Sequence, residues 1–587
     1  MRKIRALVLL PFATCIFLTA NAQVLQLDEK PSKADEDQQA TKAKAIALLV
    51  EMEGLIAQIK SPITRIKAQL QVAQLLWNTD EKRAGKYFAD ATTGFKEYIA
   101  SLDASDEDYQ QQFHLVNELR FQIIRMLAER DPDAALNFIY SSKPPPNPYE
   151  ATRYSSTQEG MLELSIANQV MLTDPNKALQ IARQSLKTHY SVNLVSTVGQ
   201  LRNKNPEIAA QFASDIANKL LNDKLLSNAE AASVALNLLR FAQYQDRRSA
   251  GPGTDGNTRV PVLSDEQYRE LLKKAVTEAL SFSQSLSGSY LPEQDAALNL
   301  LYGLRQFGPE VDTVNGGSMA AIQKKLLELN PNVARSDQYQ TLIGSNSFEA
   351  ALEGIGKVPA DQREQLYIQL ANREAGNGES ARARQLISER VSNPYQRRQA
   401  FANVDQQEIY GALAKGKAEE ALRMISGLRT QRERANYVTQ IANQIRPGQK
   451  REDVINLLEQ AKSLLGPSLP VQGQEQMQGL IEIARAFGSY DAKRSFEILD
   501  PLVDQLNEMC AAARTLDGFG QTFYDDDELD LEKGNSVSQA ALRISRVLGT
   551  LALVNFDRAR ATSDRLRQPE VRLRAYLEIA QQTIQTK

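Results

Sequence analysis

The sequence predicts an all-α protein, built as an α-solenoid of antiparallel helical hairpins. A nine-residue pattern recurs along the chain: Arg or Gln comes first, small or apolar residues come fourth, sixth and eighth, and usually Ala comes last. A second small residue follows each internal copy and opens another helical run. Apolar residues otherwise recur every three or four positions, with few β-branched runs, which is the period of an amphipathic helix.

The pattern is clearest between Pro394 and Ile445, where one copy starts at Arg434 and ends at Ala442. The other copies end at Ala73, Ala371, Ala484 and Ala580, with a degenerate copy ending at Asp405 and a weaker one at Ala167. Between Ala371 and Ala484 the copies are spaced by about 34 to 42 residues, within the range of helical-hairpin arrays.

The second small residue lies about 11 to 16 positions after the end of each internal copy. Two helices can approach to about 8–10 Å only where the side chains at their crossing are short. A hairpin cannot bury its apolar stripe alone, so each needs a neighbour. We therefore expect the following residues at helix crossings: Ala84, Ala178, Ala383, Ala421, Val454 and Ser495.

The first 22 residues predict a cleaved signal peptide. Arg2, Lys3 and Arg5 form a basic head, an apolar run follows, and Ala20–Ala22 is an A-x-A cleavage site. The run is short for a membrane span, which needs about 20 residues. A lipoprotein anchor at Cys15 is the alternative. The sequence therefore predicts an exported chain, periplasmic or secreted, most consistent with a bacterial envelope, with no transmembrane segment after cleavage.

The mature chain divides by composition. Residues 23–42 are polar and charged and predict a flexible leader. Residues 43–244 predict N-terminal hairpins, 245–262 a loop or linker rich in Gly and Pro, and 263–587 a C-terminal repeat array with an inserted loop at 516–538. Asp131-Pro132, Asp174-Pro175 and Asn205-Pro206 each predict a capped helix start. Glu570–Ile584 is half a repeat, as expected of a capping helix.

Two stretches resemble tetratricopeptide repeats. Gly416–Leu422 (GKAEEAL) is similar to the turn and second-helix start of that repeat, and Ala84, Phe88 and Ala91 keep its spacing. The family's Trp and Leu-Gly positions are mostly missing, and the spacing departs from the family's 34. The resemblance implies a superhelix that holds a protein or peptide partner in a groove, without identifying that partner.

Charge and cysteine content narrow the classes of partner. Loss of the basic head takes the formal net charge from −3 to about −6, whereas nucleic-acid binding normally leaves a basic footprint. Cys510 is the one cysteine of the mature chain, so no intrachain disulfide forms. We expect no nucleic-acid partner and a fold stabilised by helix packing.

The sequence predicts no catalytic, cofactor-binding or metal-binding residues. His114 and His189 are far apart, and no HExxH, CxxC or G-x-S-x-G motif occurs. The acidic run Asp525–Glu532 lacks the spacing of an EF-hand, which leaves a solvated loop, a cation site or a partner contact as interpretations. Phe519, Phe523 and Tyr524 beside it could fold the loop back or anchor a partner.

The arginine that recurs at the first position of the repeat is the remaining polar feature that could indicate a function. A cation in the first turns of a helix opposes the helix dipole by about 0.3–1 kcal/mol, so its repetition suggests a compensating contact. Either each arginine bonds the carbonyl end of the preceding helix or an acidic neighbour, or the arginines line a groove for an acidic partner. The candidate partner-contact residues are Arg65, Arg363, Arg397, Arg434 and Arg572.

Three classes of function remain. The first is a non-enzymatic scaffold that binds a protein or peptide in a superhelical groove. The second is an envelope enzyme acting on glycans, of α/α-toroid or transglycosylase type. Such an enzyme needs paired carboxylates and usually aromatic side chains on which sugars stack. The chain has one Trp and 6% aromatic residues, which disfavours this class. The third is a structural or assembly role as an oligomer.

Overall fold

The computed structural model describes residues 33–586, apart from 107, 146–157, 250–259, 284–291, 315, 330–338, 340–341, 345–346, 446–449, 467–469 and 526. The predicted signal peptide and the first part of the predicted leader lie outside the described residues. Within them, the elements are helices except for one short β-hairpin, which confirms the all-α prediction.

The N-terminal half consists of helices of varied length. They are α1 (Lys33–Gln58), α2 (Pro62–Leu76), α3 (Glu81–Ser101), α4 (Tyr109–Ala128), α5 (Pro132–Ser141), α6 (Gln158–Val170), α7 (Pro175–Thr188), α8 (Asn193–Lys204), α9 (Pro206–Asn222), the 3₁₀ turn η1 (Leu225–Ser227), α10 (Ala229–Ser249), α11 (Asp265–Ser281), α12 (Pro292–Leu304), η2 (Arg305–Phe307), α13 (Pro309–Val314) and α14 (Ser318–Leu329).

The C-terminal half continues the same organisation. Its elements are α16 (Phe348–Gly356), α17 (Ala360–Gly376), α18 (Ser380–Arg390), α19 (Pro394–Ala414), α20 (Ala418–Ser426), α21 (Gln431–Gln444), α22 (Arg451–Ser463), α23 (Gln474–Gly488), α24 (Ala492–Leu516), the antiparallel strands β1 (Tyr524–Asp525) and β2 (Glu528–Leu529), α25 (Ser536–Ala552), α26 (Phe556–Asp564) and α27 (Pro569–Gln585).

Helix starts follow the predicted capping chemistry. The side chain of Asp131 accepts hydrogen bonds from the backbone N–H groups of Asp133 and Ala134, and Asp174 caps α7 in the same way. Asn205 caps α9, and each of these three helices has Pro in its first turn. The capped starts predicted from the sequence are confirmed.

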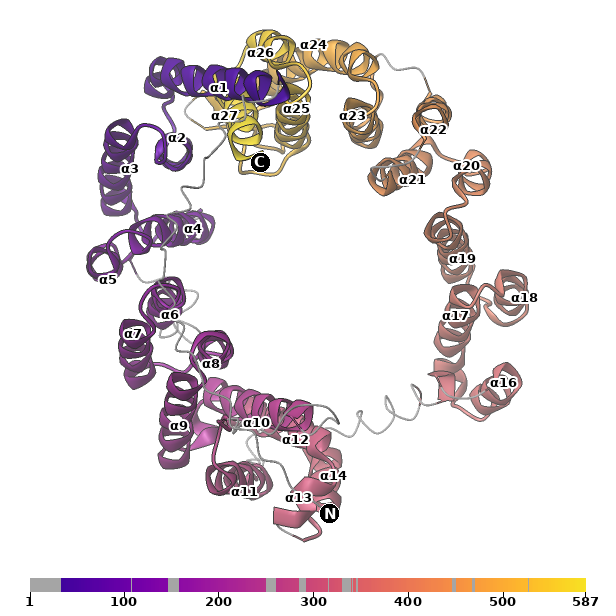
Figure 1. Cartoon of the computed structure of the whole chain (residues 1–587). Helices are drawn as coiled ribbons and strands as arrows, with labels where there is room; N and C mark the ends of the chain where they lie inside the picture. Colours follow the sequence, from indigo (N-terminus) through magenta and orange to yellow (C-terminus); the bar gives the residue numbers. More distant parts are fainter. Residues whose placement is uncertain are drawn as a thin grey trace, which may run out of the picture.

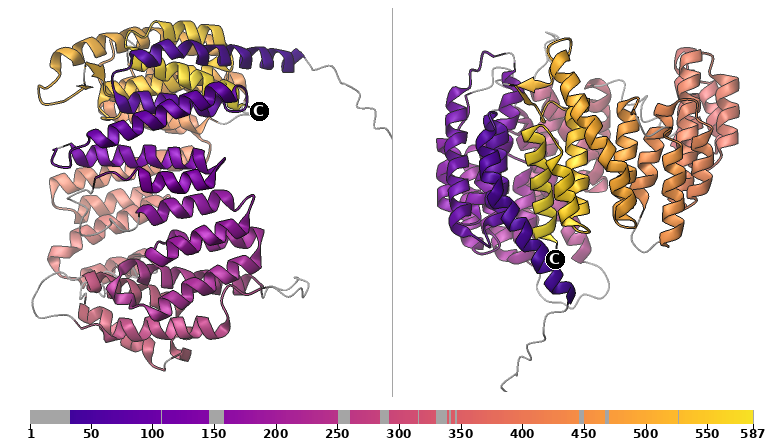
Figure 2. Two further views of the ribbon diagram at one scale, coloured as in Figure 1. Left: turned by 90° about the vertical axis from the view of Figure 1, so that its left-hand side faces the viewer. Right: turned by 90° about the horizontal axis from the view of Figure 1, so that it is seen from above.

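The helices form two concentric layers around a ring (Figure 1). α2, α4, α6 and α8 lie on the inside, with α3, α5, α7 and α9 outside them; α17, α19, α21 and α23 are inside α18, α20, α22 and α24. The inner helices pack on their outer neighbours and in most cases on the next inner helix, as α4 does on α5 and α6. The side views in Figure 2 show the stacked helices forming the wall of this ring.

The small residues predicted at crossings are buried between these helices. Ala84, Ala178, Ala383, Ala421 and Ser495 have no exposed surface, and Val454 has almost none. The Ser495 hydroxyl donates to the carbonyl of Ala484, 2.5 Å away, which joins the two small positions of one repeat. These residues therefore let the paired helices approach closely.

The ring closes where the first helix packs on the last. α1 packs against α27 and α2, and the views in Figures 1 and 2 agree on this placement. Apolar residues of α1 belong to two different cores: Ala45 and Leu48 pack with the C-terminal helices, and Leu49, Met52 and Ile56 with the N-terminal ones. α1 thus connects the core of the N-terminal helices with that of the C-terminal helices.

This closure corrects the expectation that Glu570–Ile584 is a capping helix. α27 lies between α25 and α2, and α1 supplies the outer helix that its half-repeat lacks. One face of α27, with Leu573, Leu577 and Ala580, joins the N-terminal core, and the other face joins the C-terminal core. A terminal cap would instead leave one face in solvent.

Two predicted boundaries are wrong. α1 begins at Lys33, inside the segment predicted as a flexible leader up to residue 42, because packing of its later turns on α27 supports a helix that charge alone disfavours. α10 continues to Ser249, inside the predicted loop 245–262, since helix formers precede the Gly-Pro stretch. Residues 250–259 of that loop lie outside the described part of the chain.

Candidate functional site

Four of the five candidate arginines bond the carbonyl end of the helix before them. The guanidinium of Arg65 donates to the carbonyl of Ile59 at 3.2 Å, and Arg434 donates to Leu428 at 3.1 Å. Arg363 donates to the carbonyl of Val358 at 2.5 Å, and Arg397 to that of Val391 at 2.7 Å. Each acceptor lies just after α1, α20, α16 or α18, where carbonyls lack helical partners.

These hydrogen bonds agree with the first of the two interpretations of the arginines, in which each one bonds the carbonyl end of the preceding helix. A donated hydrogen bond to the negative end of the previous helix offsets the unfavourable position of the cation at the start of its own helix. All five side chains, including Arg572 on α27, are half-buried. Contact of these residues with a partner stays a prediction.

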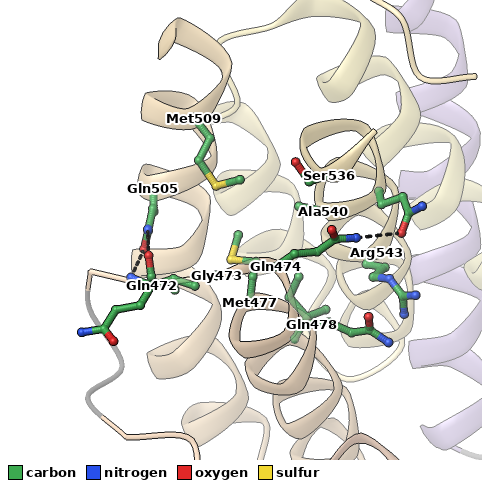
Figure 3. Close-up of a pocket in the computed structure, with 13 residues that line it drawn as sticks. Gln472, Gly473, Gln474, Met477, Gln478, Gln505, Met509, Ser536, Ala540 and Arg543 are labelled. Atoms are coloured by element: carbon green, nitrogen blue, oxygen red, sulfur yellow. Dashed lines mark hydrogen bonds between the residues drawn. The ribbon is translucent and has the colours of Figure 1, made fainter. Parts of the chain in front are cut away.

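A groove lies between the first turns of α23 and α25 and the second half of α24 (Figure 3). It has a volume of about 250 Å³. Its lining combines an apolar floor with a rim of amides: Val471, Gln472, Gly473, Gln474, Met477, Gln478, Ile481, Gln505, Met509, Ser536, Gln539, Ala540 and Arg543.

The rim amides are partly held in place by each other and by the backbone. The side chain of Gln505 accepts from the N–H of Val471 at 3.1 Å and donates to its carbonyl at 3.3 Å. Gln474 on α23 donates to Gln539 on α25 at 3.4 Å, which links the two inner helices across the groove (Figure 3). Sequence reasoning missed this site, because glutamines on helix surfaces are ordinary residues.

A larger concavity, of about 890 Å³, lies between α20 and α22. Charges of both signs line it, including Lys417, Arg423 and Lys450 beside Glu419 and Asp453. Mixed charges of this kind are typical of a solvated surface between two outer helices. We therefore take the groove at α23–α25 as the candidate binding site.

The acidic run 525–532 has a structural role within the chain. Its β-hairpin lies against α27 and the segment between α1 and α2. There the Glu528 carboxylate accepts hydrogen bonds from the backbone N–H groups of Lys60 and Ser61, at 2.5 and 2.9 Å. Glu532 pairs with Lys67 of α2 at 2.9 Å. Phe523 and Tyr524 are buried, whereas Phe519 is 83% exposed. The run is thus not simply a solvated loop, because two of its carboxylates are bound to the start of α2.

The histidines and Cys510 lie in separate surroundings. His114 is on α4 beside the ring of Phe113, and His189 follows α7, with its ring against Gly160. Cys510 is buried on α24, and burial raises the pKa of its thiol to about 12. Within the described part of the chain, no group of His, Cys, Asp and Glu is arranged to hold a metal ion.

Among the described residues, the largest fully buried side chain is that of Arg120 on α4. It donates to the Ser142 hydroxyl at 3.2 Å and to the carbonyl of Ile139, and its nearest carboxylate is Glu159 of α6 at 3.8 Å. Burial lowers the pKa of this guanidinium. The arginine joins α4, α5 and α6 in the wall of the ring.

No helix in the described portion combines the length and apolar character needed to cross a bilayer. No family model matches the sequence, and no curated protein matches it. Among solved structures, the chain is similar to one described as a "Circular tandem repeat protein with novel repeat topology and enhanced subunit contact surfaces". The two are 14% identical, the match covers 89% of this chain and 99% of that one, and the TM-score is 0.16. So low a score adds nothing to the helix contacts described above.

Proposed function

We propose that this protein is an exported, non-enzymatic scaffold that holds a protein or peptide partner. In this proposal its hairpins form a tetratricopeptide-like antiparallel solenoid, bent into a ring, and export depends on the signal peptide at residues 1–22. The partner binds the inner layer, where the groove at α23–α25 presents amides and apolar side chains. That groove is the observation that carries the proposal.

The lining of the groove supports a binding role. Among the described residues that line it, none carries a carboxylate or an imidazole. A glycosidase needs two carboxylates that flank the scissile bond, and general acid–base chemistry uses groups that titrate near neutral pH. Amides and methionines can hold a ligand by hydrogen bonds and adaptable apolar contact without acting on it.

The test is capture of a partner by the tagged mature chain, starting at Gln23, from the extracytoplasmic fraction of the source cell. We expect one or a few proteins to be retained specifically, and light scattering to give the stoichiometry of the complex. Repeated capture of nothing specific would count against the scaffold. Turnover of peptidoglycan or polysaccharide by the purified protein would favour the enzyme of the second class instead.

A further inference from the structure

The floor of the groove at α23–α25 is suited to one apolar side chain. Met477 and Ile481 of α23 and Ala540 of α25 are almost fully buried below it, and Met509 of α24 is half-buried beside it. A volume of about 250 Å³ is below the roughly 300–1,000 Å³ of most small-molecule sites. Methionines adapt to side chains of differing shape. The floor therefore fits an aliphatic side chain better than a cofactor.

Most of the described residues that line the groove are uncharged. Arg543 is the one charged residue in the described part of the lining, and its guanidinium pairs with Glu482 at 3.2 Å. Glu482 also pairs with Arg485 at 2.7 Å, so the two guanidiniums share one carboxylate. A cationic side chain entering the groove would lose water and meet Arg543, and an anionic one would have to compete with Glu482 for that guanidinium, so burying either charge is costly.

The rim matches the hydrogen-bonding groups of a peptide backbone. A glutamine amide offers both donors and an acceptor, and Gln505 already bonds both the N–H and the carbonyl of Val471. The bond between Gln474 and Gln539 is long, at 3.4 Å, so a backbone group of a ligand can replace it at little cost. None of the lining residues that the structure describes is aromatic, so they offer no ring on which a sugar could stack.

We propose that this groove binds an extended, uncharged peptide segment. One apolar side chain of the peptide, of the size of leucine or methionine, rests on Met477, and the flanking backbone bonds Gln474, Gln478 and Gln539. This inference rests on the proposed scaffold function and specifies the chemistry of the partner segment.

The test is selection of a displayed library of random seven-residue peptides on the mature chain. We expect the enriched peptides to be uncharged around one central aliphatic residue. Replacing that residue by Asp or Lys should weaken binding at least tenfold, as measured by fluorescence anisotropy with labelled peptides. Enrichment of charged peptides, or of none, would overturn the inference.

Two groove variants complete the experiment. Met509→Glu and Gln478→Glu each place a carboxylate in the lining, and each should weaken binding of the selected peptides at least tenfold. Gln399→Glu, on the exposed side of α19, is the matched control and should change nothing. Circular dichroism verifies that each variant is folded; an affinity unchanged in both groove variants would refute the site.

The same variants separate this inference from the scaffold function. If both variants still capture the cellular partner as well as the wild type does, the peptide groove is refuted while the scaffold stands. If the wild type itself captures nothing, the scaffold fails, and the peptide selection still reports on the groove.

Discussion

The half-buried arginines show how one side chain can join successive hairpins. Arg397 begins α19 and bonds the last carbonyls of the α18 turn, at Val391 and Ser392. Arg434 repeats the arrangement one hairpin later, with Leu428 after α20. Each arginine therefore fixes the angle between an outer helix and the inner helix that follows it.

Removing two of these arginines tests that role. Arg397→Ala with Arg434→Ala should lower the free energy of unfolding by about 1 kcal/mol per site, since a charged donor contributes about 1.5–3 kcal/mol when buried and less when half-exposed. Partner capture should be unaffected. Urea unfolding and the capture experiment measure the two quantities.

The matched control is Arg398→Ala with Arg429→Ala, which removes two exposed arginines beside the same helices. It should leave stability within about 0.5 kcal/mol of the wild type. If the Arg397 and Arg434 pair instead loses the partner while keeping its stability, these arginines face the partner rather than the preceding helix.

Glu570 makes stability depend on pH. Its side chain is 2% exposed at the start of α27, and its carboxylate accepts the N–H of Leu529 at 2.7 Å. Burial raises the pKa of this carboxyl, although its backbone hydrogen bonds oppose the shift. The folded state therefore keeps the proton at a pH where the unfolded chain has lost it, and stability falls as pH rises through that window.

Glu570→Gln removes this titration but keeps an acceptor for Leu529. Below the ordinary pKa of glutamate, near 4.5, the variant and the wild type should be about equally stable. As pH rises above that value the variant should become the more stable of the two. Melting temperatures between about pH 4 and pH 8 give the comparison. Glu508→Gln, at an exposed site on α24, should show no such divergence; a constant offset at every pH would exclude the titration.

At the scale of elements, α25 and α27 approach each other closely in the closure region. A Cβ added at Gly549 would lie 2.8 Å from the carbonyl oxygen of Glu578 and 2.9 Å from its carbonyl carbon. Those atoms belong to the backbone of α27 and cannot move aside as a side chain can. Gly549 therefore sets the separation of these two helices.

Gly549→Ala should destabilise the protein by about 1–3 kcal/mol, because the helices must shift apart. Gly85→Ala is the control: Gly85 lies in α3 with no atom within 4 Å of the added Cβ, so alanine there should be neutral or stabilise by up to about 1 kcal/mol. Hydrogen exchange along α27 locates the effect. Equal responses from the two variants would show that the crossing does not depend on Gly549.

Much of the element level was predictable from the sequence. Capping residues such as Asp174 bond backbone groups a few residues away in the chain, so they can be recognised from the sequence. Small residues such as Ala421 recur at regular spacing, and this spacing indicates where two helices cross. The groove at α23–α25 was not predictable, since Gln474 and Gln539 meet only through the packing of two helices that are distant in sequence. The arginine contacts were foreseen as one of two alternatives because the acceptor lies six residues or fewer away.

At the scale of the whole molecule, ring closure could not be read from the sequence. Curvature is the sum of small rotations from one hairpin to the next, and no single residue encodes it. Closure also depends on α1, whose first turns lie in a polar and charged segment that the sequence predicts to be a flexible leader. The polar contacts between the ends of the chain include Lys44 with Asp557 at 2.7 Å and Glu51 with Arg560 at 2.6 Å. Such exposed pairs contribute little, so apolar packing of α1 must hold the ring closed.

Leu48→Asp tests the closure directly. Leu48 is fully buried in the core that α1 shares with the C-terminal helices. Loss of a buried leucine costs about 2–5 kcal/mol, and a buried carboxylate without a partner adds to that cost. Because α1 is held through one face only, we expect it to detach while the remaining hairpins stay folded. The ring should then open, with a larger radius of gyration in small-angle scattering and nearly unchanged helicity.

Leu327→Asp is the matched control, since Leu327 on α14 is 47% exposed and the same substitution there should alter neither shape nor helicity. Hydrogen exchange distinguishes the possible outcomes for Leu48→Asp. Exchange that becomes fast in α1 alone, together with expansion, means that α1 closes the ring as a separable helix. An unchanged radius with α1 still protected would mean that other contacts hold the ends together, and loss of helicity throughout would mean that the hairpins cannot stand without closure.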